Sequence, residues 1–387
     1  MAVHGASGGG GSGGSGGAGV SSNSFGLSND GSIIGGNGGA GGAGGSSIFG
    51  SGTGGTDGSG GGGVVSTGDS TVTSAGSIRG GLSGSGAQAD AVDLSGGANT
   101  LTLENGYSFT GNVVSTSGTT NGGDTLALGG TANDTFNLAQ IVAASPTGWT
   151  GTAQYYGFNN FAKTGTSTWT VAGTAGAAFA GGITVAAGTL QLGTVGAPAT
   201  MGGGSAMVNA GATLSGTGTL NAPTTIAAGA MLSPGYGASV GTLNITSTLG
   251  MFGTLGIGIN GTGSGNFDLL DVSGQAALGS TSFFNFMLGN DTSQTKGQTF
   301  QFFDASSFLN FADVGNNFNC SGLMSGLSCM LGMNTTGNGL FLRLDASGGG
   351  GGTTSVPEPG SLGMFGLGLL LLGGGLGWRT RRDRKEA

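Results

Sequence analysis

The sequence predicts an all-β fold, a parallel β-helix in which short strands stack in successive coils. Glycine supplies 95 of the 387 residues and charged residues only 7%, yet 36% of the chain is hydrophobic. Disordered chains are usually poor in aliphatic residues, so this composition argues for a packed core. Glycine shows no Gly-X-Y period, which excludes a collagen triple helix. The other two observations are short alternating runs and an internal repeat.

The short runs have the two-residue period of β-strands. Apolar residues alternate with small polar ones in residues 71–73, 101–103, 125–128 and 168–171, and glycine or Asn-Gly turns separate such runs. This alternation places one set of side chains inward and the other outward. We find no long segment with helical period before residue 360.

The internal repeat has a spacing near 20 residues. Residues 185–190 (VAAGTL) recur as 208–214 (VNAGATL) and as 226–232 (IAAGAML), with turn glycines 23 and 18 residues apart. Residues 31–36 and 76–81 form another pair, offset by 45. Such periods indicate one unit stacked on copies of itself, here roughly 16 coils about 4.8 Å apart. A β-sandwich or several short β domains are the alternatives, but neither predicts this period.

The chain divides into four segments by composition. Residues 1–20 are expected to be a glycine-rich flexible linker, 21–345 the β-helix, 346–355 a second glycine-rich linker and 356–387 a sorting signal. Residues 1–19 lack the basic region and apolar stretch of a secretory signal peptide. Because the rest of the chain argues for export, we expect this start to be truncated and the true one to lie upstream.

The repeats resemble a known family. Residues 181–193 (GGITVAAGTLQLG) look like the autotransporter-associated β-strand repeat. Residues 232–235 followed by 240–243, and residues 266–274, resemble the end of such passengers. The resemblance implies a right-handed parallel β-helix displayed outside a Gram-negative cell. The chain departs from autotransporters in its C-terminal segment.

That segment resembles a PEP-CTERM sorting signal. Val356, Pro357, Glu358 and Pro359 precede an apolar run over residues 362–378, and Arg379, Arg381 and Arg382 follow it. The resemblance implies recognition and processing by a membrane-embedded exosortase. The run is at the short end for a single transmembrane helix, and the arginines should form a cytoplasmic stop. An anchor that is never cleaved is the alternative.

Charge and cysteine content limit the partners. The net charge is −8, and residues 1–354 hold only Arg79, Lys163, Lys296 and Arg343 as basic residues. No electrostatic footprint for nucleic acid is present. Cys320 and Cys329 could form a disulfide in an oxidising compartment, or could be two unpaired thiols, because spacing alone does not fix the geometry.

Few residues in the sequence could support catalysis or bind a metal ion. The single histidine, His4, lies in the expected linker, so neither a histidine triad nor a histidine-rich metal site is expected. Asp268 and Asp271, with Lys296 and Arg343 the nearest cations in sequence, are the residues a β-helix polysaccharide lyase would use. Residues 129–136 partly match a calcium-binding nonapeptide, with Asp124 as the nearest candidate partner.

These observations lead to one expected function and two alternatives. We expect a non-enzymatic, cofactor-free, exported protein of the cell surface or extracellular matrix, with exosortase, exopolysaccharide or neighbouring cells as partners and the membrane bound through the C-terminal helix. A polysaccharide-active β-helix enzyme is the first alternative, and a calcium-stabilised adhesin is the second.

Overall fold

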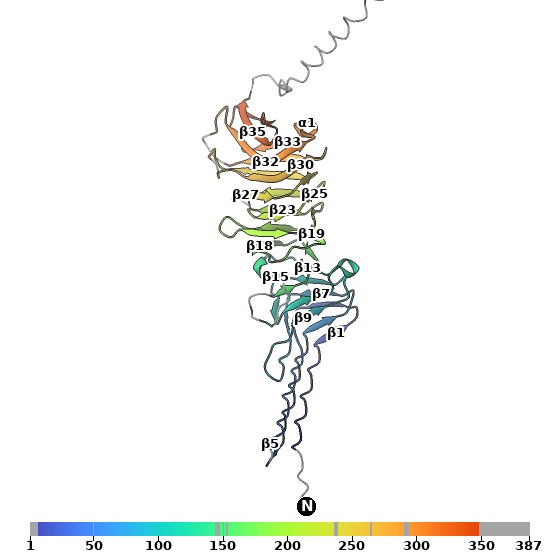
Figure 1. Cartoon of the computed structure of the whole chain (residues 1–387). Coiled ribbons are helices and arrows are strands. Elements are labelled where there is room, and N and C mark those ends of the chain that lie inside the picture. The colour runs from blue at the N-terminus through green and yellow to red at the C-terminus, as the bar shows by residue number, and fades with distance from the viewer. Residues whose placement is uncertain are drawn as a thin grey trace, which may run out of the picture.

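A computed structural model describes residues 7–48, 50–143, 148–149, 151, 154–235, 239–263, 265–289 and 294–347. In these residues short strands stack coil upon coil along one axis (Figure 1). Almost all the strand pairs are parallel, and adjacent strands belong to successive coils. The prediction of an all-β solenoid is therefore confirmed.

One parallel sheet runs along the length of the solenoid. In stacking order it contains β2 (Gly26–Asn29), β7 (Thr71–Ser74), β10 (Thr100–Leu103), β13 (Thr125–Leu128), β17 (Asn160–Lys163), β19 (Gly182–Val185), β22 (Ala206–Val208), β25 (Thr224–Ile226), β28 (Leu249–Met251), β30 (Leu269–Leu278) and β32 (Thr299–Leu309). These are eleven strands in the described part of the chain, fewer than the expected 16 coils. Part of the chain lies outside the stack of coils, in the glycine-rich segments described below.

Two further sheets form the other sides of the N-terminal coils. The first contains β1 (Val20–Ser22), β6 (Val64–Ser66), β9 (Val92–Leu94), β12 (Val113–Ser115), β16 (Tyr155–Tyr156) and β15 (Ile141–Val142). The second contains β3 (Ser32–Ile34), β8 (Ser77–Arg79) and β11 (Ser108–Thr110).

The C-terminal coils are completed by other parallel strands. One set is β14 (Asp134–Asn137), β18 (Thr168–Thr174), β20 (Thr189–Leu192), β23 (Thr213–Gly216), β26 (Met231–Pro234), β29 (Thr254–Ile259), β31 (Phe283–Leu288) and β33 (Phe318–Ser321). The other is β21 (Ala199–Gly202), β24 (Thr219–Asn221) and β27 (Thr242–Ile245), which leads into β30.

The repeats found in the sequence are the strands that pair in register. Val185 pairs with Val208, which pairs with Ile226. The leucines of the same repeats pair as well, Leu190 with Leu214 and Leu214 with Leu232. Because the inward side chains stack on one another, the core is continuous along the axis.

The strand register predicts a large difference between two neighbouring substitutions. Val208 is 1% exposed, whereas Thr213 is only half-buried. We expect Val208→Asp to lower the free energy of unfolding by several kcal/mol, because it buries an unpaired carboxylate. Thr213→Asp should cost about 0.5 kcal/mol or less. Urea unfolding of both variants measures this difference, and equal losses would show that the assigned register is wrong.

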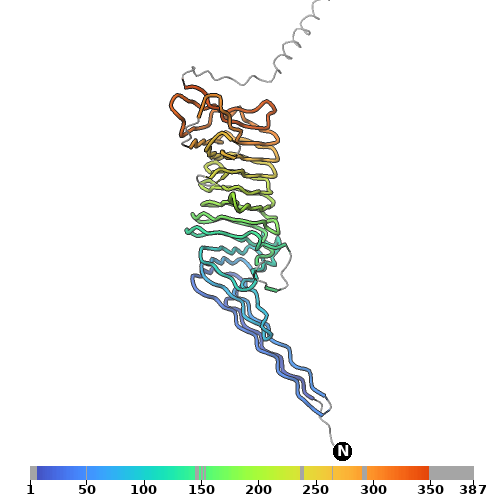
Figure 2. Tube along the Cα trace, turned by 90° about the vertical axis from the view of Figure 1, so that its left-hand side faces the viewer, coloured from blue at the N-terminus to red at the C-terminus, as the bar shows by residue number. Residues whose placement is uncertain are grey.

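Three glycine-rich segments leave the N-terminal coils and form a stalk. Residues 8–19, 35–45 and 52–63 lie side by side, and the hairpin of β4 (Ser46–Ser47) and β5 (Gly50–Ser51) joins the last two at the tip (Figure 2). Each segment donates backbone hydrogen bonds to another at every third residue, as in Gly13 N to Thr56 O, Gly39 N to Gly14 O and Gly58 N to Gly39 O.

The stalk corrects the expectation of a flexible linker over residues 1–20. Residues 8–19 are hydrogen-bonded on two sides, to residues 36–45 and to residues 53–62. A period of three residues is that of the extended polyproline-II helix, which has no internal hydrogen bonds, so its backbone groups can bond to neighbouring segments. Glycine recurs at every third residue in each segment because the chains approach closely. Residues 1–6, including His4, lie outside the described residues.

The C-terminal end of the solenoid changes to antiparallel pairing. β34 (Leu327–Met333) pairs with β35 (Gly339–Ala346), which pairs with β32. A short helix, α1 (Phe311–Val314), precedes β33, and a disulfide between Cys320 and Cys329 joins β33 to β34. Within residues 7–347, where described, no helix is long and apolar enough to cross a membrane. The predicted transmembrane segment, residues 362–378, lies outside that part of the chain.

Candidate functional site

The structure brings together segments that the family resemblance had singled out. Asp268 is 4% exposed, and its carboxylate accepts hydrogen bonds from Gly241 N (2.8 Å) and Gly258 N (2.7 Å). A side chain at Gly235 would meet the same carboxylate at 2.5 Å. Burial raises the pKa of Asp268 to about 6, and the two backbone donors partly oppose this. Asp268 therefore links the residue before β27 to strand β29 and has a structural role.

The residues proposed for a lyase do not form one site. Asp271 is exposed on β30 and lies beside Asp304 of the next coil, whereas Asp268 is buried. Arg343 forms an ion pair with Asp345 (3.1 Å). Lys296 lies in a turn before β32. No acid and base converge on a common point among these residues.

Asp124 is also buried, with four donors around it. It is 0% exposed and accepts from Asn99 N (3.0 Å), Asn99 Nδ2 (2.9 Å), Ser115 Oγ (2.7 Å) and Ser117 Oγ (2.8 Å). Asp134, the acid of the partial nonapeptide, bonds instead to Thr135 N. The two carboxylates therefore do not form the calcium site that the sequence suggested, because all four contacts of Asp124 are made by protein donors.

A buried lysine is held by backbone carbonyls. Lys163 is 0% exposed at an inward position of β17, between Leu128 and Val185 of the adjacent coils. Its ammonium donates to the carbonyl oxygens of Thr164, Gly165 (3.0 Å) and Ala187 (3.2 Å). Burial lowers its pKa to about 8. The lysine ties together the turns of two coils.

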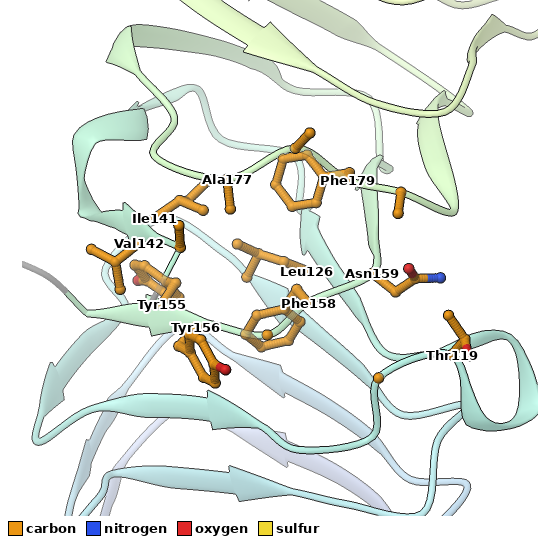
Figure 3. A pocket seen from close by; sticks show the side chains of 15 residues that line it. Thr119, Leu126, Ile141, Val142, Tyr155, Tyr156, Phe158, Asn159, Ala177 and Phe179 are labelled. Carbon is orange, nitrogen blue, oxygen red and sulfur yellow. The ribbon is translucent and has the colours of Figure 1, made fainter. Parts of the chain in front are cut away.

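One pocket is lined partly by β15 and β16, the last two strands of the sheet that begins with β1 (Figure 3). Its volume is about 230 Å³. Apolar and aromatic side chains form most of the lining, and Thr119, Tyr156 and Asn159 add polar groups. The Asn159 amide donates to Gly122 O (3.0 Å). The principal apolar contributors are Leu126, Ile141, Tyr155, Phe158 and Phe179.

The lining of this pocket is mostly apolar. Its described lining contains no carboxylate, histidine, lysine or cysteine. Burial raises the pKa of the Tyr155 hydroxyl well above its ordinary value, so the group stays protonated at neutral pH. Over the described residues, no group of three or more His, Cys, Asp or Glu side chains could hold a metal ion.

Comparison with known proteins identifies the C-terminal segment. Residues 355–382 match the family model of the PEP-CTERM protein-sorting motif. This signal indicates an exported protein that is associated with the cell envelope and processed by exosortase. The sorting residues Val356–Pro359 and the arginines Arg379, Arg381 and Arg382 lie outside the described residues. No curated protein matches the chain.

Proposed function

We propose that the chain is a non-enzymatic structural or adhesion protein of the Gram-negative cell surface or extracellular matrix. The PEP-CTERM motif at residues 355–382 carries this proposal, because it indicates export and envelope association. The solenoid is the part displayed, with a right-handed coil like that of autotransporter passengers. A single C-terminal helix over residues 362–378 holds it in the membrane until exosortase cleaves near Val356–Pro359.

Regular hydroxyl rows on the solenoid support exopolysaccharide as a partner. Thr71, Thr100 and Thr125 occupy the same outward position in three successive coils. Thr168, Thr189 and Thr213 form a second row on another face. Because adjacent coils are about 4.8 Å apart, each row repeats hydroxyl groups at a spacing similar to a sugar unit. A repetitive polymer can contact many such groups at once.

The cysteine pair fits an exported protein. Cys320 and Cys329 are joined in the C-terminal cap, and disulfides persist in oxidising compartments outside the cytoplasm. The acidic body, with four basic residues before residue 355, gives no basis for nucleic-acid binding.

Deleting residues 356–387 tests the proposed sorting and attachment. Both forms are expressed behind the same signal peptide in a host that lacks exosortase, so that the full-length form keeps its C-terminal segment. We expect the deletion to release the protein from the envelope fraction. The far-UV circular dichroism of the body should stay unchanged, because solenoid coils are stabilised by their neighbours. Continued envelope attachment of the shortened form would contradict the proposal.

A further inference from the structure

The pocket of Figure 3 shares a wall with a second pocket in the next coil. The second pocket has a volume of about 260 Å³. Ala177 and Ala178 line both pockets and therefore stand between them. Thr174, which also lines the second pocket, pairs with Thr200 of the following coil, so this pocket lies one coil further along the axis. Because the shared side chains are only methyl groups, the two pockets form one short groove.

Aromatic rings form two sides of the first pocket. Tyr156 and Phe158 lie on the side of β16, and Phe179 lies opposite them (Figure 3). Phe158 and Phe179 are buried, whereas Tyr156 is half-buried and leaves part of its ring for a ligand to cover. A hexose has a face made mainly of C–H groups, which aromatic rings cover as they cover other apolar surfaces. The volume of about 230 Å³ is below the roughly 300–1,000 Å³ of most ligand sites, so the pocket suits a single small ring.

Uncharged polar groups line the rest of the groove. The Asn159 amide donates to Gly122 O (3.0 Å), and this bond holds the side chain at the edge of the first pocket. Thr174, Thr200 and Asn221 line the second pocket. Hydroxyl and amide groups both donate and accept hydrogen bonds, as the hydroxyl groups of a sugar do. The described lining of the two pockets contains no Asp, Glu, Lys, Arg or His, so no charged group there would pair with a charged sugar.

We propose that this groove binds two consecutive units of a neutral hexose polysaccharide. Adjacent coils are about 4.8 Å apart, which is similar to the length of one sugar unit, so neighbouring units reach both pockets. The aromatic pocket covers the C–H face of one unit, and the second pocket bonds to the hydroxyl groups of the next. An anionic polysaccharide is disfavoured, because the chain carries a net charge of −8 and the described lining holds no cation. The inference rests on the proposed function and names its polysaccharide class and its binding site.

Titration calorimetry of the full-length protein with short oligosaccharides tests the inference. The neutral probes are cellohexaose, laminarihexaose, maltohexaose and mannohexaose, and hexagalacturonate is the anionic probe. We expect saturable binding of at least one neutral hexamer, with one site per chain. Hexagalacturonate should bind at least about tenfold more weakly, because its carboxylates meet no counter-charge in the groove. Absence of saturable binding by every neutral hexamer, or equal binding of hexagalacturonate, would overturn the inference.

Two substitutions test whether the sugar binds in the groove. Tyr156→Ala removes the half-exposed ring and should weaken binding at least about tenfold, because aromatic side chains dominate binding energy. Ala178→Gln puts a longer side chain at the shared wall and should weaken binding by a similar factor. Ala132→Gln is the matched control, since Ala132 is exposed like Ala178 but lines neither pocket. This control should bind like the wild type.

Ala178→Gln keeps the test decisive if Tyr156→Ala folds poorly, because Ala178 is exposed and its substitution leaves the core intact. Binding by Ala178→Gln that equals binding by Ala132→Gln would place the sugar elsewhere on the solenoid and contradict the proposal. Export and sorting through residues 355–382 are tested separately by the deletion of residues 356–387. A failure of sugar binding is therefore distinguishable from a failure of the proposed function.

Discussion

Replacing Asp124 by alanine is expected to lower the free energy of unfolding by about 3 kcal/mol or more. The substitution leaves two donors of Asn99 and the hydroxyls of Ser115 and Ser117 without their acceptor in a buried place. Hydrogen bonds to a charged group contribute about 1.5–3 kcal/mol each, and hydroxyl groups can reorient to recover part of the loss. The first coils should therefore unfold at clearly lower urea concentration.

Two variants serve as controls for Asp124→Ala. Asp124→Asn keeps the shape of the side chain and one acceptor oxygen. We therefore expect its loss in free energy of unfolding to be less than half that of Asp124→Ala. Asp271→Ala removes an exposed carboxylate on β30 and should change stability by about 0.5 kcal/mol or less. Urea unfolding followed by circular dichroism measures all three. If Asp124→Ala and Asp271→Ala unfolded at the same urea concentration, the hydrogen bonds to the buried Asp124 carboxylate would not stabilise the fold.

In the stalk, Gly13→Ala should separate the three segments around the substituted residue. A Cβ at Gly13 would lie 1.9 Å from Gly39 O and 2.9 Å from Gly58 N, so the backbone of the neighbours must move. We expect the amides of the adjacent cross-links to exchange hydrogen at least about tenfold faster, because local opening then requires less free energy. The solenoid should keep its exchange pattern, since its coils depend on their neighbours.

The next residue supplies the matched control. A Cβ at Gly14 meets nothing within 4 Å, although Gly14 lies in the same segment and has the same composition around it. Gly14→Ala should leave the protection of the stalk amides against hydrogen exchange unchanged or increase it. Alanine has less conformational freedom than glycine in the unfolded chain, which stabilises the folded state by about 0.4–1 kcal/mol. Hydrogen-exchange mass spectrometry compares the two variants. Equal exchange in both would mean that the stalk is not held by close packing at every third residue.

Much of the body could be predicted from the sequence. The VAAGTL-type repeats and the pair at residues 31–36 and 76–81 are adjacent strands in register. The paired strands could be predicted because stacking places equivalent residues one coil apart. The repeat is therefore recognisable in the sequence even though the coils differ in length. The number of coils was overestimated, because one period was applied to segments that leave the stack.

The stalk and the buried polar groups could not be predicted in the same way. Glycine stands at every third residue over 8–19, 35–45 and 52–63, so the absence of a Gly-X-Y period holds for the chain as a whole but is wrong for these three segments. This three-residue spacing is confined to the stalk segments, so a search for one period along the whole chain does not detect it. The sequence suggested Asp124 as a calcium ligand and Asp268 as a lyase acid, and it did not indicate that both are buried, because their donors come from other coils or from residues several positions away. Only the folded chain brings those groups together.

Processing of the exported solenoid at its C-terminal signal is tested most directly by mass spectrometry of the mature protein from a host with the matching exosortase. We expect a new C-terminus near Val356–Pro359, with the arginine-containing tail removed. An intact tail through residue 387 on surface protein would show that the signal is not cleaved.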